Sequence, residues 1–367
     1  MTTKIRVIIV DDSQVMRDMI AQIVRACPDM MVVATAQDPF DAREKIKALS
    51  PDVVLLDIEM PRMDGLTFLE RIMRLRPMPV VMVSTLTVAG GEATLRALEL
   101  GAVDFVTKPS ARVRGDGVDA ANDFAADIAA KVRIAAASAP TISRRRLAPV
   151  APAPAAEKPA APELGVIARN AVIAIGASTG GIEAITTVLG GLPPGLPPIL
   201  IVQHLPQPFT RLFAARLNTL CKLKVKEAGQ GDILHPGHVY IAPGNQHLRL
   251  GRGVSGYVTQ LADEPLYNGH RPAVDHLFNS VALQARGAAV GVILSGMGAD
   301  GAAGLLNMRQ AGAMTVGQDA ATCVVYGMPR AAYEAGAVLR QAPLENIANE
   351  ILSCLRALEK TSAATLR

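Results

Sequence analysis

Short apolar runs alternate with amphipathic stretches along most of this chain, and this alternation constrains the fold more than any other feature. An apolar run followed by a stretch of helical periodicity is the pattern of a βα unit. Repeated βα units build a parallel sheet with helices on both faces. Half of the residues are hydrophobic but only 3% are aromatic, which fits buried parallel strands made of Ala, Val, Leu and Ile. We therefore expect an α/β protein.

Five βα units occupy the first part of the chain, between residue 5 and about residue 135. Their spacing predicts a doubly wound, five-stranded parallel sheet of the flavodoxin-like kind. The expected strands are residues 6–10, 31–36, 53–58, 80–84 and 104–107, and the expected helices are 15–26, 40–49, 66–75, 92–100 and 120–134.

A Pro/Ala-rich segment follows. Since proline continues neither a helix nor a β-ladder, we expect a semi-extended linker. This predicts three parts: a domain over residues 1–137, a linker over 138–167 and a second domain over 168–367. The basic run Arg144–Arg146 falls in the linker, where a solvated charge cluster is favoured over a docking site for DNA or an acidic partner.

The βα pattern resumes after the linker. It predicts a second doubly wound, mostly parallel sheet, with an antiparallel edge hairpin within residues 238–260. The expected strands are residues 171–175, 199–202, 239–241 and 290–294, and the expected helices are 182–189, 209–217, 274–284, 302–310 and 344–358.

Polar residues end several strands of the first domain, and the carboxyl ends of parallel strands gather at one edge of a sheet. Asp11, Asp12 and Asp57 would repel one another there unless a cation joins them, and Mg²⁺ suits an all-oxygen site. Asp57 could then attack phosphorus, with Lys108 balancing the charge and Ser84 binding a phosphoryl oxygen. Taken in isolation, an Asp at the end of a strand is usually a capping or turn residue, and a single Lys is usually a solvated charge.

This part of the chain resembles a response-regulator receiver domain. The matching segments are Val10-Asp11-Asp12-Ser13, Leu56–Gly65, Val83-Ser84 and Val106-Thr107-Lys108-Pro109. The resemblance implies that Asp57 is the phospho-acceptor and that a histidine kinase is the phosphodonor. It also implies that Asp11, Asp12, Asp57 and the Glu59 carbonyl hold Mg²⁺, and that Ser84, Phe105 and Lys108 form the switch. Ser84 and Phe105 stand where Thr and Tyr are frequent in the family.

Three residues in the second domain form a candidate nucleophile, base and orienting acid. Ser178 lies in a glycine turn after the first strand, His204 follows the second, and Asp300 lies in the glycine-rich segment after residues 290–294. The Met297 amide is a candidate oxyanion donor. The order Ser…His…Asp differs from that of α/β-hydrolases. Three non-catalytic interpretations stay open: the turn around Ser178 could bind a phosphate, His204 could be structural, and Asp300 could cap a helix.

Other polar residues carry weaker signals. His235 and His238 could suggest a metal pair, but Pro236-Gly237 between them favours a turn. Asp263, Asp275 and the pair His270-Arg271 are candidates for the pocket lining, and a structural salt bridge is an equal reading for Arg271.

The second domain resembles the catalytic domain of chemotaxis protein-glutamate methylesterases. The matching segments are Ile175–Gly181, Gln203-His204, Ala242–His247, Arg271–Asp275 and Gly296–Gly301. The resemblance implies a Ser178–His204–Asp300 triad that needs no cofactor and an oxyanion donor at Met297. It implies hydrolysis of glutamate methyl esters on methylated chemoreceptors, deamidation of their glutamines, and activation by phosphorylation. The unphosphorylated receiver is expected to cover the Ser178 cleft.

Bulk properties exclude several other classes of function. A net charge of +4 and few aromatic residues argue against nucleic-acid binding. Four cysteines without a CxxC pair, no signal peptide and no long apolar run indicate a cytoplasmic protein without membrane insertion. A phosphorylation-controlled scaffold with a degenerate hydrolase domain is the main alternative, and a DNA-binding response regulator is a weaker one.

Overall fold

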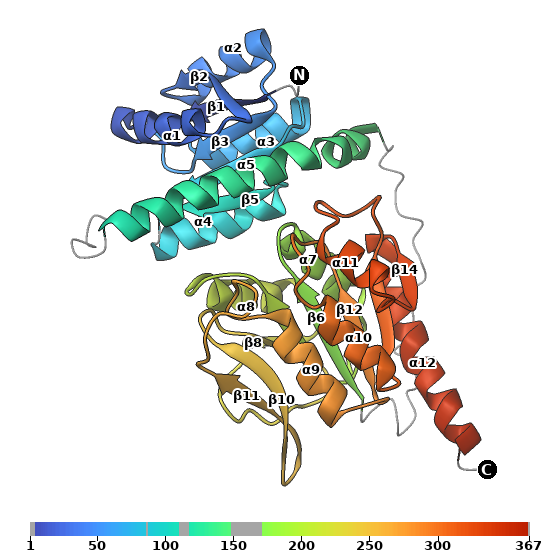
Figure 1. Cartoon of the computed structure of the whole chain (residues 1–367). Coiled ribbons are helices and arrows are strands. Elements are labelled where there is room, and N and C mark those ends of the chain that lie inside the picture. Colours follow the sequence, from blue (N-terminus) through green and yellow to red (C-terminus); the bar gives the residue numbers. More distant parts are fainter. Residues whose placement is uncertain (1–3, 86, 110–116, 148–170, 366–367) are drawn as a thin grey trace. The chain divides into compact units, whose positions relative to one another are not determined.

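The computed structural model describes residues 4–85, 87–109, 117–147 and 171–365. The chain divides into two compact units at Pro149/Val150. The unit up to Pro149 is named the receiver unit and the unit from Val150 the catalytic unit, after the two families that they resemble (Figure 1).

The receiver unit is a five-stranded parallel sheet in the order β2-β1-β3-β4-β5. Helix α1 lies beside α5 (Figure 1). Helix α3 packs against α4. The strands are β1 (Ile5–Val10), β2 (Met30–Ala36), β3 (Val53–Asp57), β4 (Val80–Ser84) and β5 (Asp104–Thr107). The helices are α1 (Gln14–Ala26), α2 (Pro39–Leu49), α3 (Gly65–Leu75), α4 (Val88–Glu99) and α5 (Gly117–Leu147).

Local chemistry explains where the receiver elements begin. Every residue of β3 is buried, as expected for a central parallel strand. Asp38, Asp64 and Thr87 each cap the N-terminus of the following helix, because their side-chain oxygens accept hydrogen bonds from its first amides. These caps end the loops that follow the carboxyl ends of β2, β3 and β4.

The catalytic unit is a seven-stranded parallel sheet in the order β14-β13-β12-β6-β7-β9-β8. Helices α9, α10 and α11 pack in sequence against one another, and α7 packs against α8 and α12 (Figure 1). Its strands are β6 (Val172–Ala177), β7 (Ile199–Gln203), β8 (Lys224–Glu227), β9 (His238–Ile241), β12 (Ala289–Ile293), β13 (Met314–Gln318) and β14 (Arg340–Ala342). Its helices are α7 (Gly181–Gly191), α8 (Phe209–Leu220), α9 (Val274–Gln284), α10 (Ala302–Gln310), α11 (Met328–Glu334), the 3₁₀ turn η1 (Leu344–Asn346) and α12 (Ile347–Thr365).

Both sheets reverse their strand order next to their first strand. In the receiver unit β1 lies between β2 and β3, and in the catalytic unit β6 lies between β12 and β7. Loops at such a switch point diverge and leave a crevice at the carboxyl ends of the strands, where ligands bind in open α/β sheets. The predicted fold class, with two doubly wound parallel sheets, is confirmed.

The structure differs from the expected elements in three respects. First, α5 remains helical to Leu147, over residues expected to start the linker. Ala135 and Ser138 are buried, so packing explains the extension of the helix into the expected linker as far as Ser138. The side chains of Arg144–Arg146 lie outside the described residues.

Second, the hairpin is a separate sheet. β10 (His247–Gly253) pairs with β11 (Gly256–Ala262), while the edges of the seven-stranded sheet are β14 and β8. Third, the sequence patterns missed β8, β13, β14 and α11. The β8 sequence KVKE has a single buried residue, which is typical of a solvated edge strand and gives little apolar signal.

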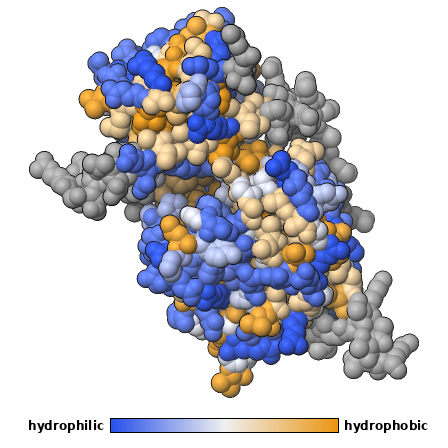
Figure 2. All heavy atoms as spheres, viewed as in Figure 1, coloured by the Kyte–Doolittle hydropathy of each residue, from blue (hydrophilic) through white to orange (hydrophobic). Residues whose placement is uncertain are grey.

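No helix among the described residues has the length and apolar character needed to cross a membrane. The face of the molecule in Figure 2 is mainly hydrophilic over the catalytic unit, with apolar residues in small separate groups. Phe209, Phe213 and Phe278 are among the largest fully buried side chains of that unit.

Candidate active site and phospho-acceptor site

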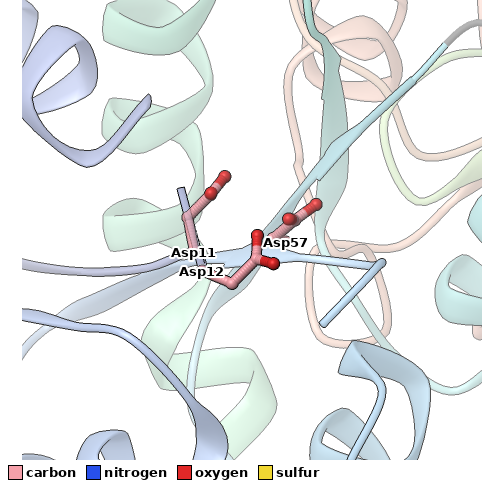
Figure 3. A group of neighbouring side chains, drawn as sticks. All are labelled: Asp11, Asp12 and Asp57. Carbon is pink, nitrogen blue, oxygen red and sulfur yellow. The ribbon is translucent and has the colours of Figure 1, made fainter. Parts of the chain in front are cut away.

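Three carboxylates meet at the carboxyl ends of β1 and β3 in the receiver unit. Asp11 and Asp57 are buried and Asp12 is exposed. Oxygen atoms of all three lie within 4.8 Å of one another, and Figure 3 shows their side chains converging. Gly65 lets the start of α3 approach the backbone at the end of β3, because a Cβ there would lie 2.0 Å from the carbonyl oxygen of Asp57.

Lys108 neutralises part of this charge. Its Nζ lies 2.9 Å from Asp11 Oδ2 and 2.9 Å from Asp57 Oδ1. Burial acts to lower the pKa of Lys108, but its bonds to the two carboxylates outweigh burial and raise it. Burial raises the pKa of Asp57 to about 6; Lys108 opposes this rise and the charge of Asp11 adds to it.

These residues fit a hard divalent cation. Three carboxylates against one ammonium group leave excess negative charge, and every donor is an oxygen, as Mg²⁺ prefers. Asp12, Asp57, Glu59 and Lys108 line an open cleft of about 710 Å³, which gives an ion and a phosphoryl group access to Asp57.

Ser84 is the last residue of β4, and Phe105 lies within the neighbouring strand β5. Ser84 is buried, and its Oγ lies 2.7 Å from Thr94 Oγ1 on α4, which makes it the acceptor of a hydrogen bond. Phe105 is also buried, with the Lys131 ammonium 5.0 Å from its ring centroid. Both residues therefore occupy internal positions that connect the sheet to α4 and α5.

In the catalytic unit, Ser178, His204 and Asp300 follow the adjacent strands β6, β7 and β12. Backbone hydrogen bonds tie their loops together. The Ser178 amide donates to the Ser295 carbonyl at 3.0 Å, and the His204 amide donates to the Ala177 carbonyl at 3.2 Å. The sheet topology thus brings to one edge three residues that lie far apart in the sequence.

His204 and Asp300 form a buried pair. His204 Nε2 lies 2.8 Å from Asp300 Oδ2, and both side chains are at least 90% buried. Because Nε2 is engaged, Nδ1 is the nitrogen left to act as a base; it is buried and has no partner among the described residues. The side chains of Ser178 and His204 are not hydrogen-bonded, and in free enzymes such bonds commonly tighten only when substrate binds.

Asp300 also caps a helix, but not the one that the sequence suggested. Its carboxylate accepts hydrogen bonds from the amides of Val274 at 2.7 Å and Asp275 at 3.1 Å, at the start of α9. The N-cap residue of α10 is Gly301, which has no side chain to cap that helix. Burial would raise the pKa of Asp300, but the bond with His204 and the two amides outweigh it and lower the pKa. The carboxylate is therefore ionised and can accept a proton-bearing Nε2.

The glycine-rich loop after β12 lies against the serine. A Cβ at Gly296 would lie 2.9 Å from Ser178 Cβ. Met297 is the next residue, and its amide makes no hydrogen bond within the described part of the chain. An amide with this position and no internal acceptor suits a negatively charged oxygen on a group bonded to Ser178.

Gln203 holds the serine turn, a role that the sequence patterns did not single out. Its Nε2 donates to the Ser178 carbonyl at 2.8 Å, and the Gly181 amide donates to the same oxygen at 2.7 Å. The only sequence signal was its position directly before His204 at the end of β7.

The weaker candidates separate into structural and active-site residues. Arg271 pairs with Asp263 at 2.7 Å, and Asp275 accepts a hydrogen bond from the Gly304 amide in α10. His238 Nδ1 lies 3.1 Å from the Pro236 carbonyl, as expected for a turn. His270, in contrast, stacks directly on His204.

Comparison with known proteins is consistent with this geometry. Residues 7–115 match the model of the response regulator receiver domain, and residues 173–351 match that of the CheB methylesterase. The protein-glutamate methylesterase/protein-glutamine glutaminase 3 of Burkholderia lata is 54% identical over 96% of both chains.

The chain belongs to the protein-glutamate methylesterase family. It is a carboxylic ester hydrolase joined to a receiver domain. An Escherichia coli member is 52% identical, over 97% of this chain and 98% of its own length. The crystal structure of the Thermotoga maritima CheB methylesterase catalytic domain is 36% identical, with a TM-score of 0.49 over 50% of this chain and 98% of that one.

Proposed function

We propose that this methylesterase hydrolyses glutamate γ-methyl esters on the cytoplasmic parts of chemoreceptors, and that a phosphoryl group on Asp57 activates it. The observation that carries the esterase chemistry is the buried His204–Asp300 pair at the sheet edge where Ser178 lies. The proposed substrate comes from the names of the relatives, which are protein-glutamate methylesterases/protein-glutamine glutaminases.

Acylation begins when His204 Nδ1 takes the Ser178 hydroxyl proton and Oγ attacks the ester carbonyl carbon. The Met297 amide donates to the resulting oxyanion. His204 then returns the proton to the methoxy oxygen, the carbon–oxygen bond breaks and methanol leaves. The Asp300 carboxylate accepts a hydrogen bond from Nε2–H throughout and stabilises the imidazolium.

Deacylation repeats these steps with water as the nucleophile, and it releases the receptor glutamate and regenerates Ser178. A glutamine amide reacts by the same route with ammonia as the leaving group. We propose that the chain also acts as a deamidase in this way.

In the receiver unit, Asp57 is the proposed phospho-acceptor and a histidine kinase the proposed phosphodonor. Asp11, Asp12, Asp57 and the Glu59 carbonyl would hold Mg²⁺, which when bound neutralises phosphoryl charge. Lys108 lies within reach of an oxygen on Asp57. Ser84 and Phe105 are proposed to transmit the structural change that follows phosphorylation of Asp57. Each of these steps takes place in the cytoplasm.

Methanol release from methylated receptor membranes tests the esterase. Purified full-length protein is expected to release methanol, and Ser178→Ala to release none. Thr186→Ala is a matched control, since Thr186 lies on α7 and, among the described residues, its hydroxyl donates only to the Ile182 carbonyl. Release that survives Ser178→Ala, or no release by the wild type, would overturn the proposal and favour a scaffold or a different ester.

A further inference from the structure

His270 lies flat on the imidazole of His204. The two ring centroids are 3.7 Å apart, and the ring planes differ by 14°. No proton transfer in the reaction described above uses His270. Its position over the proposed base therefore needs a separate explanation.

A short turn holds His270 in place. The amides of Tyr267 and His270 each donate to the carbonyl of the other residue, at 3.0 and 2.9 Å. Asn268 and Gly269, between them, have φ values of 52° and 80°, the conformation of a tight hairpin turn. The next residue, Arg271, is anchored by Asp263, so the His270 ring is carried on a fixed support.

The orientation of His204 depends on more than Asp300. One hydrogen bond at Nε2 fixes a point of the imidazole but leaves the ring free to tilt about that point. The direction of the Nδ1 lone pair, which has to meet the Ser178 hydroxyl, depends on that tilt. A parallel ring at 3.7 Å restricts the plane, because tilting would bring atoms of the two rings into collision.

The charge of His270 matters as well. Burial and the neighbouring His204 lower the pKa of His270 to about 4, so its ring is uncharged near neutral pH. His204 becomes a cation when it takes the serine proton. A second cation at this distance would oppose that step, whereas the face of a neutral aromatic ring attracts a cation.

We propose that His270 is a positioning residue, which holds the plane of the His204 imidazole and offers an uncharged aromatic face to the imidazolium. This inference rests on the proposed role of His204 as the base. Replacement by alanine removes both contributions, phenylalanine retains both, and lysine places a charge where the neutral ring lies.

The test measures covalent labelling of Ser178 in the full-length protein by a fluorophosphonate, with separate rate and affinity constants. We expect His270→Ala to lower the maximal labelling rate about 10- to 100-fold with little change in affinity for the probe. His270→Phe is expected to stay within about threefold of the wild type, and His270→Lys to fall as far as alanine.

His276→Ala is the matched control, because His276 forms a similar stack with His247 (3.9 Å, 16°) that does not include His204. It is expected to label at the wild-type rate. Wild-type labelling by His270→Ala, or equal losses in the Ala and Phe variants, would overturn the inference. If His270→Ala does not fold, the difference in labelling rate between His270→Phe and His270→Lys tests the inference. A wild type that is labelled but releases no methanol overturns the ester proposal and leaves this inference intact, whereas a wild type that is not labelled overturns both.

Discussion

At the scale of single residues, two glycines determine how closely other groups approach Ser178. Gly296 packs against the Ser178 side chain, and Gly181 packs against the Gln203 amide. A Cβ at Gly181 would lie 2.0 Å from Gln203 Oε1, much closer than any real contact. Gln203 donates a hydrogen bond to the Ser178 carbonyl. A substitution at Gly181 that displaces the Gln203 side chain is therefore expected to shift Ser178 as well.

Gly181→Ala is expected to displace Gln203 and lower methanol release about tenfold or more, since small misplacements of a nucleophile are costly. Gly190→Ala is the control in the same helix, because a Cβ there meets nothing within 4 Å. That variant should retain activity and gain up to about 1 kcal/mol of stability, as alanine favours helix. Equal activity in the two variants would show that the Gln203 contact is dispensable.

His270 gives a second prediction at this scale, concerning pH. Burial and the neighbouring His204 lower the pKa of His270 to about 4 in the folded protein, from an ordinary value of 6.5. The unfolded chain therefore binds more protons between these values, and stability falls as the pH is lowered through this window. His204 and Asp300, which face the ring, are present in both proteins compared.

The free energy of unfolding of the catalytic unit should thus fall more steeply from pH 6.5 to pH 4 in the wild type than in His270→Phe. Denaturant titrations at several pH values measure this difference. Parallel curves for the two proteins would show that His270 titrates normally in the folded state.

At the scale of elements, buried aspartates connect the loops to the helices beside the active site. Asp300, in the loop after β12, caps α9 through the amides of Val274 and Asp275. Asp275 in turn accepts a hydrogen bond from Gly304 in α10. The two helices that pack together on the sheet therefore hold the loop that presents Asp300 to His204.

Because Asp300 both orients His204 and caps α9, substitutions of Asp300 are expected to affect activity and stability to different extents. Asp300→Ala is expected to lose activity about a thousandfold or more. It should also lose about 1–2 kcal/mol of stability, since it removes the cap of α9. Asp300→Asn retains an acceptor oxygen, so it should lose similar activity with a smaller loss of stability. Methanol release and thermal unfolding measure the two effects; equal destabilisation by both variants would argue against the capping role.

At the scale of the whole molecule, one chain carries two doubly wound sheets, each with its polar residues beside the first strand. In the receiver unit these are the carboxylates after β1 and β3, and in the catalytic unit they follow β6, β7 and β12. The same topological rule thus positions two different chemistries.

The proposed switch predicts a response that spans both units. A small phosphodonor with Mg²⁺ should raise methanol release by the wild type but not by Asp57→Ala. Chelation of Mg²⁺ should abolish the rise without lowering the basal rate, because Ser178, His204 and Asp300 need no metal. An undiminished rise in Asp57→Ala would exclude Asp57 as the phospho-acceptor, and loss of the basal rate on chelation would contradict a cofactor-free triad.

The sequence by itself determined the two α/β units, most strands and helices, and the polar residues at their ends. These features depend on local periodicity and on residues that follow buried strands directly. The local signal was insufficient in two places: α5 continues past Pro140, and β8 is a solvated edge strand with a single buried residue.

Only the tertiary structure decided which residues meet. Long-range strand order places β12 beside β6, and this brings Asp300 to His204 across 96 positions of sequence. It also decided that Nε2 faces the carboxylate, that Asp300 caps α9, and that His270 stacks on His204. Such contacts depend on the packing of segments that no local pattern connects, so they become visible only in the folded chain.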